Sequence, residues 1–149
     1  MAISLVGYAT ATGNSANFDI SLTALTGGSD SAPSQNDIVF VVTGYNGVAD
    51  GNPGVNTTGY TELSDLYSND SRDSNLSVNW KRMGATPDTL VTCLGSGDAS
   101  RGAVGIAYVL RGVNTTTATD ATTTTATGGN GNALDSPSIT TVTNNAWVL

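Results

Sequence analysis

The stretch that decides the fold is DIVFVVTGY, residues Asp37–Tyr45, which is apolar on both of the faces that a strand would present. Side chains of a strand point alternately to its two faces, so a strand that is apolar on both is covered on both. The short length and the β-branched residues favour a strand over a helix. We therefore expect a central strand of a two-layer β-protein here.

Further strands are predicted on both sides of this stretch, because short apolar or β-branched runs recur between turn-forming residues. Two of them alternate cleanly: NFDISL (17–22), with Phe18, Ile20 and Leu22 facing inward, and NLSVNWKR (75–82), with Leu76, Val78 and Trp80 facing inward and Ser77, Asn79 and Lys81 outward. The remaining expected strands are 3–9, 89–94, 103–113 and 138–149.

Composition supports the same fold class. Only 11% of the 149 residues are charged, and glycine, asparagine and aspartate cluster between the expected strands, where turns require them. Seven or eight strands with turn signals about every 8–12 residues are typical of a sandwich. We expect an all-β fold, with residues 1–149 forming a single antiparallel β-sandwich domain that is jelly-roll-like.

Neither nucleic acid nor a membrane is expected as a partner. The formal net charge is −7, and the five cations are scattered along the chain at Arg72, Lys81, Arg82, Arg101 and Arg111. A nucleic-acid-binding surface needs clustered cations, so none is expected. No apolar run reaches the roughly 18–20 residues of a membrane span, and the first residues lack a signal-peptide pattern. We expect synthesis in the cytoplasm and no membrane contact.

Catalytic and metal chemistry find little support. The chain has no histidine and one cysteine, Cys93, within an apolar run where burial is expected. Glu62 is the only glutamate, so a hydrolytic carboxylate pair would have to come from turn aspartates such as Asp50, Asp70, Asp73 or Asp98. Those aspartates are more typical of turn chemistry. We predict no catalytic residue, no cofactor and no metal.

Two loop features leave alternatives open. The loop SNDSRDSN, 68–75, is rich in oxygen ligands but lacks EF-hand spacing and contains Arg72, so calcium is the less favoured interpretation. The glycine-rich stretch 44–60 is flanked by Tyr45 and Tyr60, with Tyr67 nearby. These tyrosines either stack on a sugar or cover a partner, or they cap the ends of the core with their hydroxyls in water.

The threonine tract, Thr115–Thr127, has strand propensity but little to bury. It is expected to be ordered and exposed, either as an edge strand or as a long connection to the closing strand.

The C-terminal half, Val78–Leu149, carries a resemblance. VNWKRMGATPDTLVTCLGSGDASRGAVGIAYVLRGVNTTTATDA, followed by SPSITTVT and AWVL, resembles structural proteins of tailed bacteriophages. The resemblance implies a non-enzymatic β-sandwich module of a virion surface or tail. Resembling sequences continue beyond the last strand, so Trp147, Val148 and Leu149 are expected either to lie within their own sheet or to dock on a neighbouring subunit or the capsid.

Three functions follow as hypotheses. The first is a capsid decoration (cement) protein that binds the major capsid protein and itself, as a trimer, on the virion. The second is a tail or fibre module that binds host-surface glycans through Tyr45, Tyr60 and Tyr67. The third and least supported is a glycan hydrolase with paired carboxylates.

Overall fold

The computed structural model describes residues 2–14, 16–47, 49–69, 73–98, 100–127, 137–144 and 146–148. Within these ranges the chain forms strands and no helix, which confirms the all-β prediction. The strands are β1 (Ser4–Gly13), β2 (Asn17–Ser21), β3 (Ile38–Asn46), β4 (Gly54–Val55), β5 (Thr61–Ser68), β6 (Ser74–Arg82), β7 (Leu90–Leu94) and β8 (Ala103–Arg111).

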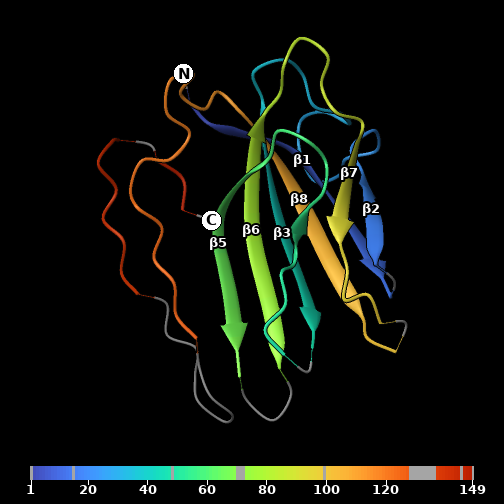
Figure 1. Ribbon diagram of the computed structural model, residues 1–149. Coiled ribbons are helices and arrows are strands. Elements are labelled where there is room, and N and C mark those ends of the chain that lie inside the picture. The colour runs from blue at the N-terminus through green and yellow to red at the C-terminus, as the bar shows by residue number, and fades with distance from the viewer. Residues whose placement is uncertain are drawn as a thin grey trace.

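The strands form two antiparallel sheets that pack face to face, as Figure 1 shows. The larger sheet has the order β1-β8-β3-β6-β5 and the smaller has the order β2-β7-β4. The pairs β1–β8, β2–β7 and β3–β6 are nested as in a jelly roll, where one long hairpin folds over on itself. The exception is β5, which pairs with β6 in the larger sheet instead of with β4.

The main core fills the space between the sheets. Its fully buried side chains include Ile20 and Val91 from the smaller sheet and Val39, Val41 and Val109 from the larger one. Phe18, Ile20 and Leu22 all face inward, as the alternation predicts. Cys93 is buried in the same core, and burial raises the pKa of its thiol to about 12, so it packs as a small apolar side chain.

Strand β6 has the opposite orientation to the one predicted. Asn75, Ser77 and Asn79 are buried on the face that looks toward the smaller sheet, whereas Leu76 on the other face is 38% exposed. Hydrogen bonds compensate the buried polar groups: Asn79 Nδ2 donates to Ser77 Oγ at 2.6 Å, and Asn75 Oδ1 accepts from Gly51 N at 2.8 Å. The apolar residues of β6 therefore lie on the outer face, defined here as the face of the larger sheet turned away from the smaller one.

Strands β4 and β5 were not predicted. The pairing of β5 with β6 shifts register between Glu62 and Ser64, so Leu63 occupies a bulge. A bulge inserts one residue and breaks the alternation by which a strand is recognised in sequence. The acidic, irregular stretch TELSDLYS consequently lacks a strand signal although it forms an edge strand.

The closing strand expected at 138–149 is absent from the described residues 137–144 and 146–148, which have no strand conformation. The threonine tract before it is exposed and also irregular, so it is a connection and not an edge strand. We call residues 112–148 the C-terminal segment. Figure 1 shows the described parts of this segment, in orange to red, on the side of the larger sheet away from β2 and β7.

The edge of β1 is covered by the loop between β2 and β3. Tyr8 and Thr26 exchange two backbone hydrogen bonds, of 2.9 and 3.0 Å, and Asp30 N donates to the Val6 carbonyl at 2.9 Å. Covering an edge in this way protects it from pairing with other chains. The opposite edge of the larger sheet is β5.

Candidate functional site

The outer face of the larger sheet carries a second apolar surface. It is formed by alternate residues of three neighbouring strands: Ile38, Phe40 and Val42 of β3, Leu76, Val78 and Trp80 of β6, and Tyr108 and Leu110 of β8. Strands β3 and β8 are thus apolar on both faces, as predicted for β3. A surface of this size and character needs a cover.

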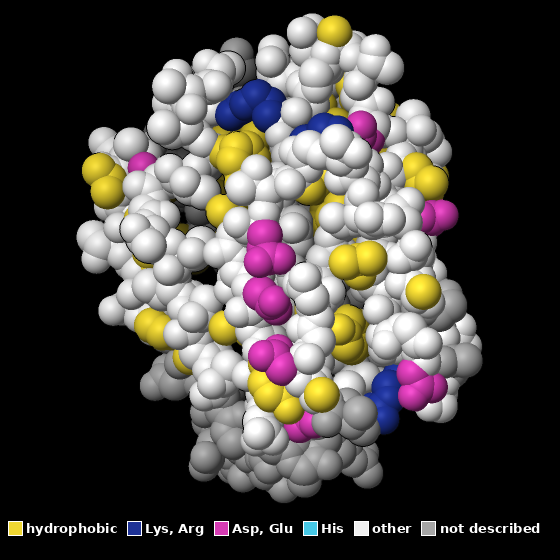
Figure 2. Space-filling model, in the orientation of Figure 1, with side chains coloured by type: hydrophobic (Ala, Val, Ile, Leu, Met, Phe, Trp, Pro, Cys, Tyr) yellow, Lys and Arg dark blue, Asp and Glu magenta, His cyan; other side chains and the backbone are white. Residues whose placement is uncertain are grey.

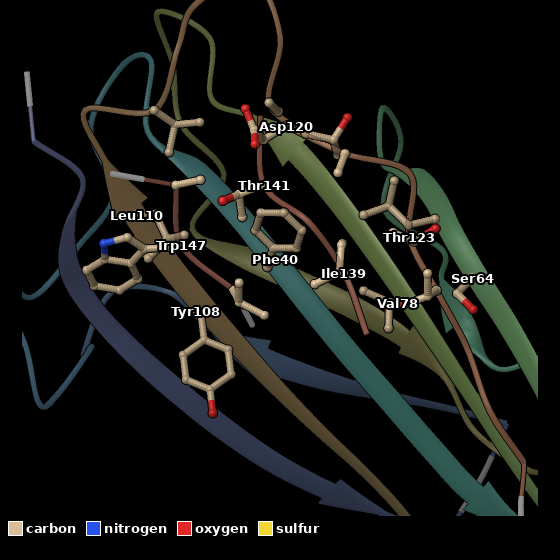
Figure 3. A pocket seen from close by; sticks show the side chains of 18 of the residues that line it. Phe40, Ser64, Val78, Tyr108, Leu110, Asp120, Thr123, Ile139, Thr141 and Trp147 are labelled. Atoms are coloured by element: carbon tan, nitrogen blue, oxygen red, sulfur yellow. The ribbon is translucent and has the colours of Figure 1, made fainter. Parts of the chain in front are cut away.

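The C-terminal segment lies over this face and leaves a cavity of about 900 Å³ beneath it. Figure 3 shows Phe40, Val78 and Tyr108 on the sheet, with Ile139 and Trp147 reaching in from the segment. The segment also contributes threonines such as Thr123 and Thr141 to the cavity wall. This pocket is partly open to solvent, so the segment covers the outer face incompletely.

One carboxylate holds two parts of the segment together. Asp120 accepts hydrogen bonds from the backbone amides of Val142 and Thr143 and from Thr143 Oγ1, the last at 2.6 Å. The Thr143 hydroxyl, followed by the two amides, lowers the pKa of the Asp120 carboxyl. A side chain therefore satisfies amides that a neighbouring strand would bond in a sheet.

The start of the segment is fixed to the sheet by arginine. Arg82, at the end of β6, donates from Nη2 to the Asn114 carbonyl and from Nη1 to the Asn36 carbonyl at 3.1 Å. Val113 and Ala118 pack near this point against Ile38 and Leu110. Contact with the sheet is therefore firm at the beginning of the segment.

The hydrogen bonds that Asp120 accepts from Val142 and Thr143 are expected to be sensitive to acid. The pKa of the Asp120 carboxyl is lowered in the folded chain. These bonds therefore contribute fully to stability above the ordinary carboxyl pKa, and their contribution is lost as pH falls through the lowered pKa. An NMR titration should give a lowered Asp120 pKa and faster exchange of the Val142 and Thr143 amides at low pH. Thr143→Val should move the pKa back toward its ordinary value. An ordinary Asp120 pKa in the unmodified chain would contradict this arrangement.

Of the residues predicted to form an interface, Trp147 and Val148 lie in this region. Both line the cavity, yet they remain 46% and 66% exposed. Neither belongs to a strand, so the expectation that they lie within their own sheet is wrong. Leu149 lies outside the described residues.

The predicted tyrosines separate into two places. Tyr45 of β3 and Tyr67 of β5 both lie opposite Asn75 of β6, so three neighbouring strands bring them into one row. Burial, followed by the charge of Asp65, raises the pKa of Tyr45. Tyr60 lies at the other end of β5, because Thr61 pairs with Trp80.

Tyr60 belongs to the core and not to a binding surface. Its hydroxyl is buried without a hydrogen-bond partner among the described atoms, and Lys81 Nζ lies 5.5 Å from its ring centroid. Burial, followed by the charge of Asp88, raises its pKa. The same lysine pairs with Asp88 at 2.7 Å. This packing is structural, so of the two interpretations the capping one suits the Tyr60 ring, although its hydroxyl is buried and not in water.

Carboxylates lie near the row of Tyr45 and Tyr67. Figure 2 shows acidic side chains in a column down the middle of the face in view. Glu62 and Asp65 share one face of β5, and burial followed by the charge of Asp50 raises the pKa of Asp65. Glu62 Oε2 accepts from Ser77 Oγ at 3.5 Å.

Of the remaining predicted aspartates, Asp73 lies beside Tyr67 and hydrogen-bonds it, whereas Asp98 is not part of that group. Asp98 lies in the turn before β8, where Ser100 and Arg101 hydrogen-bond its carboxylate, so its role is in the turn. Asp70 and Arg72 of the proposed calcium loop lie outside the described residues. Among the residues that are described, no three acidic or cysteine side chains are placed to hold a metal ion.

Sequence reasoning missed the outer face because it assigned the apolar side of β6 to the main core. The signal that locates it is the two-faced apolar character of 37–45 and 103–113, since two adjacent strands of this kind require a cover on each side of their sheet.

No known protein family, no curated protein and no solved structure matches this chain. The described part of the structure contains no helix with the length and apolar character needed to span a membrane.

Proposed function

We propose that this chain is a non-enzymatic structural protein of a bacteriophage virion, and that it decorates the capsid by binding the outer shell. Its partners in this proposal are the major capsid protein and further copies of the chain. It is made in the host cytoplasm and acts on the assembled particle.

The observation that carries the proposal is the apolar outer face with its incomplete cover. Trp147 and Val148 are 46% and 66% exposed beside a cavity that Phe40, Val78 and Tyr108 line. Exposed apolar surface of this kind is typical of protein–protein contact. Many copies on a symmetric shell gain avidity from individually modest contacts.

The strand connectivity lends further support. Nested antiparallel pairing of β1–β8, β2–β7 and β3–β6 is the order of jelly rolls, which serve as building blocks of viral shells and also of lectins. This support is an analogy at the level of fold, and a fold does not determine function. The choice between a shell protein and a lectin therefore depends on the surface residues of this chain.

The test is to purify the particle whose genome encodes the chain and to examine it by mass spectrometry and cryo-electron microscopy. Density for the sandwich outside the capsid lattice, with the outer face turned to the shell or to a sister copy, is the expected result. Particles that lack the chain, or that carry it only on the tail, would remove the decoration proposal.

The second candidate function is host-glycan binding by a tail or fibre module. It is favoured by one observation, the row of Tyr45 and Tyr67 across Asn75 with carboxylates beside it. Aromatic rings and acidic or amide side chains commonly stack on sugars and hydrogen-bond their hydroxyls. Tyr67→Ala should then abolish saturable binding to host cells, whereas Tyr8→Ala, which removes an exposed tyrosine of β1, should leave it unchanged.

A further inference from the structure

Residues 137–141 of the C-terminal segment have the side-chain alternation of a strand without the pairing of one. Pro137, Ile139 and Thr141 line the cavity, whereas Ser138 and Thr140 between them do not. Alternation with a period of two is the geometry of an extended strand that faces a surface on one side. The chain bends at Val142 and Thr143, so the strand-like stretch is short.

Main-chain partners for this stretch are scarce among the described residues. In the described parts of 112–148, no backbone-to-backbone hydrogen bond connects the segment to the sheet. The amides of Val142 and Thr143 bond the Asp120 carboxylate, which belongs to the same segment. A strand gains most of its stability from a neighbouring strand, so this arrangement leaves the stretch weakly held.

The cover is also incomplete. A half-open pocket of about 900 Å³ lies between the segment and Phe40, Val78 and Tyr108, and the side chains of Val142 and Val148 are 79% and 66% exposed. Close docking of a segment of this composition on the outer face would fill the pocket, and contact with a second molecule would bury the exposed apolar side chains.

An edge strand, β5, lies beside the same face. The edge of β1 is covered by the loop that contains Thr26 and Asp30, whereas β5 is described as paired only with β6. Ser64 and Leu66 of β5 contribute to the cavity wall, so the edge and the apolar face are continuous. An extended segment placed there finds main-chain groups and apolar contacts together.

We infer that copies of this chain exchange their C-terminal segments: residues 137–148 of one copy dock on the outer face of the larger sheet, along β5, of a second copy. The occupant is the chain's own segment, because its alternating side chains already line that face. The threonine tract, Thr115–Thr127, is exposed and has no strand conformation, so it can act as a tether through which the segment reaches a neighbour at little extra entropic cost. Exchange of identical elements is a low-cost route to closed oligomers.

This inference rests on the proposed role in assembly and names its self-contact, but purified chain alone suffices to test it. Two single variants, Ser64→Cys in the sheet and Thr141→Cys in the segment, are refolded together and treated with a short bis-maleimide. Both positions line the cavity, and the native Cys93 is buried. Exchange predicts a covalent product of two chains that contains one of each variant. The double variant in a single chain is the reference for a contact within the chain.

A second pair of variants tests whether the segment holds the copies together. Light scattering should give a mass of two or more chains for the unmodified protein and for Val104→Asp, an exposed position on β8 outside the cavity. Ile139→Asp, which places a charge in the cavity wall, should reduce the mass to that of one chain.

The opposite outcomes overturn the inference. A single-chain mass for the unmodified protein, cross-links only within one chain, or equal behaviour of Ile139→Asp and Val104→Asp would each exclude segment exchange. Decoration of capsids by single chains would remain possible after any of these results. Conversely, exchange in solution combined with absence from purified particles would remove the decoration proposal and leave the exchange intact.

Discussion

Gly28→Ala is expected to destabilise the protein by about 2–3 kcal/mol, because the new methyl group would overlap backbone atoms of β1. A Cβ at this position would meet the Val6 carbonyl and lie 2.6 Å from Gly7 N, both of which are backbone atoms of β1. The loop cannot easily move away, since Thr26, Ser29 and Asp30 all hydrogen-bond to β1. Urea unfolding followed by tryptophan fluorescence measures the loss.

Gly84→Ala is the matched control for this variant. No atom lies within 4 Å of the Cβ that it would introduce, so its unfolding free energy should stay within about 0.5 kcal/mol of the unmodified protein. If Gly28→Ala were as mild as Gly84→Ala, the loop would not lie on β1 as described.

The same variant bears on assembly. The loop around Gly28 is the cover of the β1 edge, so loosening it exposes a second strand edge in addition to β5. Any new self-association of Gly28→Ala would then proceed through β1 and should persist in a chain that also carries Ile139→Asp. This difference separates an exposed edge from segment exchange.

The strands that sequence reasoning located are those whose apolar pattern was unambiguous. Residues 17–22 alternate, and residues 37–45 and 103–113 are apolar on both faces, so local pattern alone places them in the interior. Strand β5 was not found because its bulge at Leu63 breaks the pattern.

The orientation of β6 was wrong for a different reason. Alternation tells which residues share a face, but not which face of the strand looks toward the second sheet. In this chain the polar face of β6 is buried, because the loop before β4 and the β6 side chains hydrogen-bond one another there, as Gly51 and Asn75 do. The apolar face is left for the C-terminal segment to cover.

The closing segment shows that strand propensity alone does not produce a strand. Residues 138–149 have the β-branched and aromatic content of a strand, yet strand propensity is realised only against a neighbouring strand. Residues 137–144 and 146–148 have no such neighbour in the part of the chain that the structure describes. The candidate site was predicted only through Trp147 and Val148, since the cavity depends on the packing of elements far apart in sequence.

Arg111→Met is expected to lower the free energy of unfolding by about 3 kcal/mol, because it leaves the buried Asp37 carboxylate without its positively charged partner. Asp37, whose side chain is 2% exposed, accepts from Arg111 Nε at 2.9 Å and from Arg111 Nη2 at 2.8 Å. Ser34 N donates to the same carboxylate at 2.7 Å, so the group cannot turn out to solvent without breaking the loop before β3. Urea unfolding again gives the measurement.

Arg101→Met provides the comparison, since it removes the same side chain from an ion pair at the surface. Its partner, Asp98, is three residues away in an exposed turn and keeps its hydrogen bonds from Ser100. The loss should be far smaller than for Arg111→Met, because surface pairs contribute little. Equal losses for the two variants would mean that the burial of Asp37 does not decide the effect.

A double variant completes the argument. Asp37→Leu combined with Arg111→Met replaces the pair by apolar groups, and much of the stability lost in Arg111→Met should return because no buried charge remains. Arg111 is the last residue of β8, directly before the C-terminal segment, so the pair also fixes the point from which the segment departs. If segment exchange depends on that fixed departure, Arg111→Met should lower the mass measured by light scattering and the double variant should restore it. Recovery of stability without recovery of mass would show that the direction of the segment depends on the arginine itself.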